Sequence, residues 1–225
     1  MELHFTNGNR KIRGLAKLLE LKKSQVVSFD LPAGWTCPCA DICQSRADRI
    51  TGKITDGKNC SIRCYAASIE AFAIASRKLH WENFDSLRRK SIKGMVKIIL
   101  DSIPDNVKVI RVHSSGDFFN ANYFNAWRMV ASARPEIKIF GYTKVLDYVI
   151  MRKPDNFKLT YSFGGTMDAL KTDEPTAYIV KSMNEAESKN LPLGCPENDK
   201  YGDFKRIMNG ESFALVLHGT QPAKA

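Results

Sequence analysis

Five of the six cysteines of this chain lie in one short stretch, between Thr36 and Ala67. Cysteines gathered this closely form either a metal site or a set of disulfides. The N-terminal residues lack the apolar core and small-residue cleavage site of a signal peptide, so we expect a cytoplasmic protein in a reducing compartment, where disulfides are rare. The pattern therefore favours metal ligation over crosslinking and makes residues 36–67 the centre of the predicted site.

The spacing of the cysteines leaves two kinds of metal site open. Two of the spacings, Cys39 to Cys43 and Cys60 to Cys64, are those of a structural zinc site. Iron–sulfur clusters tolerate less regular spacing and use three or four thiolates, which also admits Cys37. The remote Cys195 either returns to the same end of the fold as a further ligand or is a buried free thiol.

The rest of the chain alternates between strand and helix patterns. After a turn at 6–9, a short amphipathic helix completes residues 1–24, and a long helical pattern over 65–89 has a predicted break near His80 and Trp81. Further helices are predicted at 92–103, 122–134, 145–151 and 185–190. Apolar runs bounded by turn residues predict strands at 25–31, 107–113, 138–142, 158–163, 177–180 and 213–218.

Strands that alternate with helices predict an α/β fold with parallel pairing and right-handed crossovers. Six strands are fewer than the eight of a closed barrel, so the prediction is a partial, open (β/α)6 barrel-like sheet with the cysteine-rich loop after its first strand. A doubly wound sheet is the alternative. No linker or repeat divides residues 1–225, which predicts one domain, and no apolar run is long enough to span a membrane.

Small and polar residues follow several of the predicted strands. In parallel α/β folds, ligands bind at the carboxyl ends of strands. We therefore expect a ligand pocket there that faces the cysteine loop, with Asp117 either contacting the ligand or capping the next helix. The candidate pocket residues are Ser115, Gly116, Asp117, Lys144 and His218.

The chain carries a formal net charge of +10, from 34 Lys and Arg against 24 Asp and Glu. Excess positive charge favours a polyanionic partner such as nucleic acid, and Trp81 and Phe118–Phe119 are candidate exposed aromatic residues for it. The alternative is a solvated basic surface without such a role, because the basic residues are spread along the chain.

Several motifs together resemble the phage gene product eighty-eight family over nearly the whole chain. They are residues 31–34 before Cys37-Pro38, and residues 52–57, 63–68, 111–119, 142–144 and 213–220. The resemblance implies a phage protein that acts in the cytoplasm of an infected bacterium. It also implies Cys37, Cys43, Cys64 and Cys195 as the ligand set, with Cys39 and Cys60 as alternates.

A second, weaker resemblance is to radical S-adenosylmethionine enzymes, which are partial barrels with a cysteine loop after the first strand. This likeness implies a [4Fe–4S] cluster and, if one iron lacks a protein ligand, bound S-adenosylmethionine. The expected function is therefore a phage iron–sulfur protein with a redox or radical role, acting on a small molecule or redox partner. The alternative is a basic nucleic-acid-binding or host-interaction module held together by zinc or a cluster. Whether the protein is an enzyme stays open.

Overall fold

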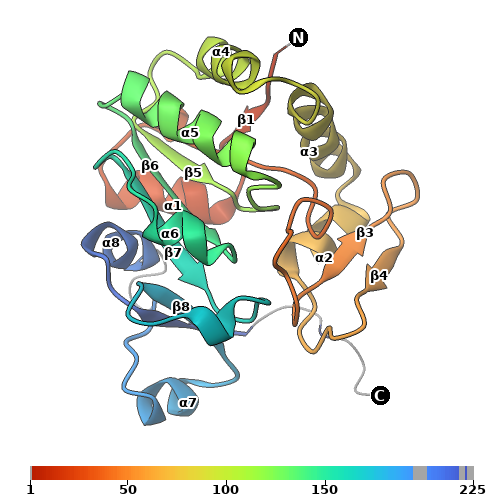
Figure 1. Cartoon of the computed structure of the whole chain (residues 1–225), viewed down its shortest axis with the longest axis vertical. Coiled ribbons are helices and arrows are strands. Elements are labelled where there is room, and N and C mark those ends of the chain that lie inside the picture. The colour runs from red at the N-terminus through yellow and green to blue at the C-terminus, as the bar shows by residue number, and fades with distance from the viewer. Residues whose placement is uncertain (1, 195–201, 218–220, 222–225) are drawn as a thin grey trace.

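The computed structural model describes residues 2–194, 202–217 and 221 (Figure 1). Its central element is a seven-stranded sheet with the order β1-β2-β5-β6-β7-β8-β9. The strands are β1 (Phe5–Thr6), β2 (Val26–Phe29), β5 (Val109–Val112), β6 (Lys138–Thr143), β7 (Phe157–Ser162), β8 (Thr176–Val180) and β9 (Phe213–Val216). All six predicted strands are present, and every pairing except that of β1 with β2 is parallel.

Helices cover both faces of this sheet. The first face packs against α4 (Ile92–Ser102), α5 (Ala121–Ala133) and α6 (Leu146–Ile150), and the largest core cluster lies there around the fully buried Trp127. The second face packs against α1 (Arg10–Leu18) and α8 (Gly202–Asn209) through a smaller core. Because both faces of the sheet are covered, most residues of its strands are apolar, and this made the strands recognisable in the sequence. In Figure 1, α5 lies in front of the sheet and α1 behind it.

The α/β class and the parallel sheet are confirmed, while the barrel-like arrangement is not. The sheet is open, with β1 and β9 at its edges, and the second face, which would line a barrel, is filled by α1 and α8. The strands also follow chain order, without the reversal that defines a doubly wound sheet. The additional strand, β1, is antiparallel and has two residues, too few to show a periodic pattern.

The cysteine-rich stretch forms a separate lobe beyond the carboxyl ends of the strands (Figure 1). It contains the antiparallel hairpin of β3 (Ser45–Ala47) and β4 (Ile54–Asp56), followed by α2 (Tyr65–Phe72) and α3 (Ile74–Leu87). The remaining elements are the 3₁₀ turns Lys23–Gln25 and Asp168–Leu170 and the short helix α7 (Met183–Ser188). Among the described residues, no helix has the length and apolarity needed to cross a membrane.

The predicted helix break near His80 and Trp81 is wrong, because the break lies at Ala73. The guanidinium of Arg77 donates to the carbonyl oxygens of Glu70 and Ala71 at the end of α2, so these helix-terminal acceptors are satisfied without a continuous helix. His80 and Trp81 lie on the buried face of α3 instead.

Candidate functional site

The cysteine loop lies directly on the ends of the central strands. The Leu31 N–H donates to the carbonyl oxygen of Ser115 after β5 (2.9 Å). Beyond β7, the Thr166 N–H donates to the carbonyl oxygen of Cys39 (3.0 Å), and Ala40 forms a β-bridge with Gly165. The loops after β5 and β7 therefore fix the loop through backbone hydrogen bonds, independently of any metal.

Three thiols from separate parts of this lobe lie within electrostatic range of one another. Cys37 follows β2, Cys43 precedes β3 and Cys64 precedes α2, and all three are partly buried free thiols. Burial raises the pKa of Cys37 well above its usual range, and the neighbouring Cys64 and Cys43 raise it further. Burial likewise raises the pKa of Cys64 to about 11, with Cys43 adding to the effect.

Backbone N–H groups face two of these sulfurs. The Gly34 N–H donates to the Cys37 sulfur at 3.4 Å. The Cys64 sulfur lies at the N-terminus of α2, where the N–H groups of Ala67 and Ala66 lower the thiol pKa in opposition to burial. Such donors stabilise the negative charge of a thiolate. These donors thus offset part of the effect of burial on the Cys37 and Cys64 thiols.

Cys39 and Cys60 are placed differently. The Cys39 side chain packs against the main core, its pKa shows no contribution from another cysteine, and Thr166 hydrogen bonds to it. The Cys60 thiol lies near Cys43, but it donates to the carbonyl oxygen of Ile62 (3.3 Å) and contacts the Ser45 hydroxyl (3.3 Å). The geometry groups Cys37, Cys43 and Cys64. Cys195 lies outside the described residues.

The sheet contributes one charge of each sign next to the thiols. Asp117 is buried, and its carboxylate accepts from the N–H groups of Phe118 (2.7 Å) and Lys144 (2.9 Å). The capping role considered for Asp117 belongs to Asn120, whose side chain caps α5. The Lys144 ammonium donates to the carbonyl oxygens of Ser162 (3.0 Å) and Phe163 (2.8 Å), and its charge lowers the pKa of Cys43 against the effect of burial.

The described pocket candidates are therefore engaged with protein groups. The Ser115 hydroxyl lies 2.7 Å from the Glu70 carboxylate and 2.9 Å from the Leu31 carbonyl oxygen. Gly116 has a φ of +85° and is approached by the cysteine loop itself rather than by open space. The loops after β5 and β6 bring Ser115, Asp117 and Lys144 to the carboxyl ends of the strands, while His218 lies outside the described residues.

Gly116→Ala will destabilise the protein. A Cβ there would lie 2.6 Å from the Thr36 hydroxyl oxygen and 2.9 Å from the Leu31 carbonyl oxygen, in a left-handed conformation that costs about 1–3 kcal/mol for other residues. We expect a loss of at least that size in the free energy of urea unfolding. Gly8→Ala is the control, because a Cβ at Gly8 meets nothing within 4 Å. Equal stabilities for the two variants would contradict this packing.

A buried polar network that the sequence did not reveal joins the cysteine lobe to the ends of β2 and β5. The Glu70 carboxylate is fully buried and accepts from His80 Nδ1 (2.7 Å), the Ser115 hydroxyl (2.7 Å) and the Ala33 N–H (3.1 Å). Asp30, at the end of β2, accepts from the N–H groups of Ser114 and Ser115. The available clue was Glu70 itself, a single acidic residue in the otherwise apolar or small pattern of α2.

Two further sequence expectations are corrected by burial. Trp81 is 8% exposed and Phe118 is fully buried, so neither offers a surface for stacking on nucleic-acid bases. Phe119 is partly buried and stacks on Tyr123 at a centroid distance of 4.5 Å. The large exposed aromatic residues include Trp35, Tyr65 and Phe72, all in the cysteine lobe.

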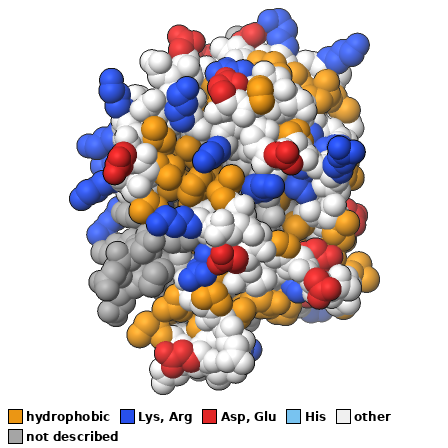
Figure 2. All heavy atoms as spheres, turned by 90° about the vertical axis from the view of Figure 1, so that its left-hand side faces the viewer, with side chains coloured by type: hydrophobic (Ala, Val, Ile, Leu, Met, Phe, Trp, Pro, Cys, Tyr) orange, Lys and Arg blue, Asp and Glu red, His pale blue; other side chains and the backbone are white. Residues whose placement is uncertain are grey.

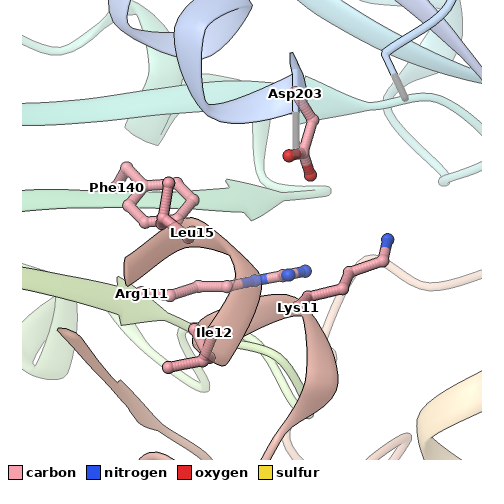
Figure 3. A pocket seen from close by; sticks show the side chains of 6 residues that line it. All are labelled: Lys11, Ile12, Leu15, Arg111, Phe140 and Asp203. Atoms are coloured by element: carbon pink, nitrogen blue, oxygen red, sulfur yellow. The ribbon is translucent and has the colours of Figure 1, made fainter. Parts of the chain in front are cut away.

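A small cavity lies on the second face of the sheet. Figure 3 shows Lys11 of α1, Arg111 of β5 and Asp203 of α8 pointing toward a shared space. Its volume is about 10 Å³, which is the space that one water molecule occupies. The Asp203 carboxylate already accepts from the Tyr142 hydroxyl (2.8 Å). This cavity is too small for an organic substrate.

The chain is similar in sequence to known phage proteins. The Gene product 88 family profile matches residues 3–223. The Gene 88 protein of Mycobacterium phage L5 is 24% identical over 222 residues, which cover 90% of this chain and 82% of that protein. The Gene 88 protein of Mycobacterium phage D29 is 26% identical over 174 residues, covering 71% of this chain and 62% of that protein. No solved structure gives a significant match. Because the profile spans almost the entire sequence, this chain belongs to the Gene product 88 family of phage proteins.

Proposed function

We propose that this phage protein binds a [4Fe–4S] cluster through Cys37, Cys43 and Cys64, with Cys195 as the fourth ligand, and that its role is in electron transfer. The observation that carries the proposal is the convergence of three free thiols from three separate segments. Soft thiolate ligands without histidine or water are those that iron–sulfur clusters prefer. The donor set therefore fits the group.

The grouping of Cys37, Cys43 and Cys64, with Cys39 apart from them, supports a cluster over a zinc ion bound by Cys39, Cys43, Cys60 and Cys64. Zinc binds thiolates at about 2.3 Å in a tetrahedron, so its sulfurs lie within about 4 Å of one another. In the described part of the chain, no three Cys, His, Asp or Glu side chains are arranged to hold one metal ion. A cubane cluster binds each thiolate to a different iron and accommodates thiols that are grouped but more widely spaced. Zinc bound by Cys39, Cys43, Cys60 and Cys64 is also disfavoured by the separate position of Cys39.

The surrounding residues have defined roles in this proposal. Because burial raises the thiol pKa values, metal loading releases protons from Cys37, Cys43 and Cys64. In a loaded site, the N–H of Gly34 at the Cys37 sulfur, and those of Ala66 and Ala67 near the Cys64 sulfur, would favour the more negative, reduced state of the cluster. The Lys144 ammonium acts in the same direction, and the Asp117 carboxylate opposes it.

Metal and sulfide analysis tests the proposal directly. Protein purified without oxygen will contain about four irons and four sulfides per chain and will show the brown colour of an iron–sulfur cluster. Stoichiometric zinc without sulfide would overturn the proposal and make the lobe a zinc-stabilised structure. Spectroscopy should be done on the same sample, so that the metal content and the signal refer to one species.

S-adenosylmethionine separates electron transfer from radical chemistry. With Cys195 as the fourth ligand, every iron has a protein thiolate, so added S-adenosylmethionine will leave the EPR signal of the reduced cluster unchanged and will not be cleaved. A changed signal together with cleavage would show an iron free to bind the cofactor. The protein would then be a radical enzyme with three cysteine ligands.

A further inference from the structure

A basic hollow lies at the amino-terminal ends of the strands, opposite the end that carries the cysteines. It is lined by Arg128 and Ser132 of α5 and by residues 152–155, which lead into β7. Its volume of about 380 Å³ is within the range of small-molecule binding sites. In Figure 1 the C-terminal end of α5 and the start of β7 are on the left, and Figure 2 views that side, where Lys and Arg side chains surround an apolar area.

The cations of the hollow have no acidic partners. Among the ion pairs of the described residues, none includes Arg128, Arg152 or Lys153. The Nε of Arg128 is buried and has no acceptor within the described chain. Asp155 also lines the hollow, so its lining contains one carboxylate and three cationic side chains. The hollow therefore has the excess positive charge that an anion would neutralise.

The positions of two of these cations are fixed by the protein. The Lys153 ammonium donates to the carbonyl oxygens of Tyr148 (2.9 Å), Val149 (2.6 Å) and Met151 (2.8 Å) at the end of α6. Its three donors are used in this way, so it contributes charge rather than a direct hydrogen bond. Arg128 is held by Asn125 (3.0 Å) and lies against the Phe124 ring. Arg152 is exposed and free to reach a ligand.

The lowered pKa of Lys153 agrees with this charge excess. Burial lowers the pKa of Lys153 to about 8, and the positive charges of Arg128 and Lys158 add to the effect. A lysine destabilised by like charges is stabilised when an anion binds nearby.

Further lysines lie near the amino-terminal ends of the neighbouring strands. Lys158, Lys138 and Lys108 lie at or just before the starts of the neighbouring parallel strands β7, β6 and β5. Successive side chains of a strand point to opposite faces, so the register places Lys138 and Lys158 on one face of the sheet and Lys108 on the other. At the same end, Glu136 is paired with Arg134. Cations both in the hollow and beyond it suit a chain of phosphates better than a single small anion.

We propose that the basic hollow binds a backbone phosphate of nucleic acid, with Lys158 and Lys138 contacting neighbouring phosphates. Phosphate contacts position a strand without reading its sequence. The net charge of +10 supports association with such a polyanion. This site is remote from the cysteines and does not depend on the metal that they bind.

Fluorescence anisotropy with a labelled DNA duplex and its single strand tests the site. Wild-type protein will bind with an affinity that falls steeply as KCl rises, since each phosphate contact contributes a slope of about −0.9 for duplex DNA. Removing one contact will therefore weaken binding about eightfold at about 0.1 M salt and lower the slope by about one. Arg152→Glu and Lys138→Glu, both at exposed positions, should each show at least this loss.

Lys53→Glu is the matched control, because Lys53 is an exposed residue of the cysteine lobe and the charge change is the same. It should retain wild-type affinity, and melting temperatures will show that all variants fold. Equal weakening by the three variants, or absence of binding at about 0.05 M salt, would overturn the proposal. Inorganic phosphate that binds in an Arg152-dependent way, without any DNA binding, would assign the hollow to a free phosphate and overturn the nucleic-acid assignment.

Discussion

Replacing Cys37, Cys43 or Cys64 with serine will reduce bound iron from about four per chain to less than about one. A hydroxyl is a poor ligand for iron in a sulfide cluster, and each of these thiols supplies one corner of the proposed site. The three side chains come from separate segments, so no neighbouring cysteine of the group replaces the lost ligand without moving its loop. Iron and sulfide are measured colorimetrically after purification without oxygen, and sulfide should fall in parallel with iron.

Cys39→Ser and Cys60→Ser are the controls for this series. Cys39 packs toward the main core, and the Cys60 thiol donates to the carbonyl oxygen of Ile62, so both variants should keep the iron of the wild type. Loss of iron in Cys39→Ser with full retention in Cys37→Ser would contradict the proposed ligand set. Cys195→Ser then tests the fourth ligand: loss of iron would support Cys195 as a ligand, and full retention would show that the cluster does not require it.

The parallel sheet was predictable because each strand can be recognised from the composition of its own short segment. Residues 26–29 and 109–112 are mostly apolar, with one polar residue each, Ser28 and Arg111, and burial on both faces favours such composition. The hairpin of β3 and β4 gave no comparable pattern. Its strands have three residues each, and residues outside the hairpin help to fix it, as in the ion pair of Asp56 in β4 with Arg63 (2.6 Å).

The candidate site was only partly predictable, for a related reason. The motifs at the ends of strands indicated Ser115, Asp117 and Lys144, and the structure brings these residues to the carboxyl ends of the strands. Their partners come from distant segments: Lys144 bonds to the end of β7, and Ser115 to Glu70 of α2. A single sequence shows which polar residues follow the strands, but not which distant groups form hydrogen bonds with them.

Glu70→Ala will destabilise the protein by about 3–5 kcal/mol, the usual cost of breaking a buried ion pair from one side. The substitution leaves His80, the Ser115 hydroxyl and the Ala33 N–H without their shared acceptor in a fully buried position. Urea unfolding of the metal-free protein measures the loss without any contribution from the proposed cluster. Glu82→Ala is the control, since its pair with His4 is about 40% exposed and such surface pairs contribute about 0–1 kcal/mol.

The effect of Glu70 will also depend on pH, in a direction set by His80. Burial lowers the pKa of His80, but the hydrogen bond to Glu70 and the charges of Asp30 and Glu70 outweigh it, so the pKa in the folded protein lies above the usual value. The resulting stabilisation is fully present below the unfolded pKa of about 6.5 and is lost as the pH rises through the folded pKa. The stability difference between wild type and Glu70→Gln should therefore be larger at about pH 6 than at about pH 9. A difference that stays constant, or grows with pH, would show that His80 is neutral in the fold and that Glu70 acts only as a hydrogen-bond acceptor for the lobe.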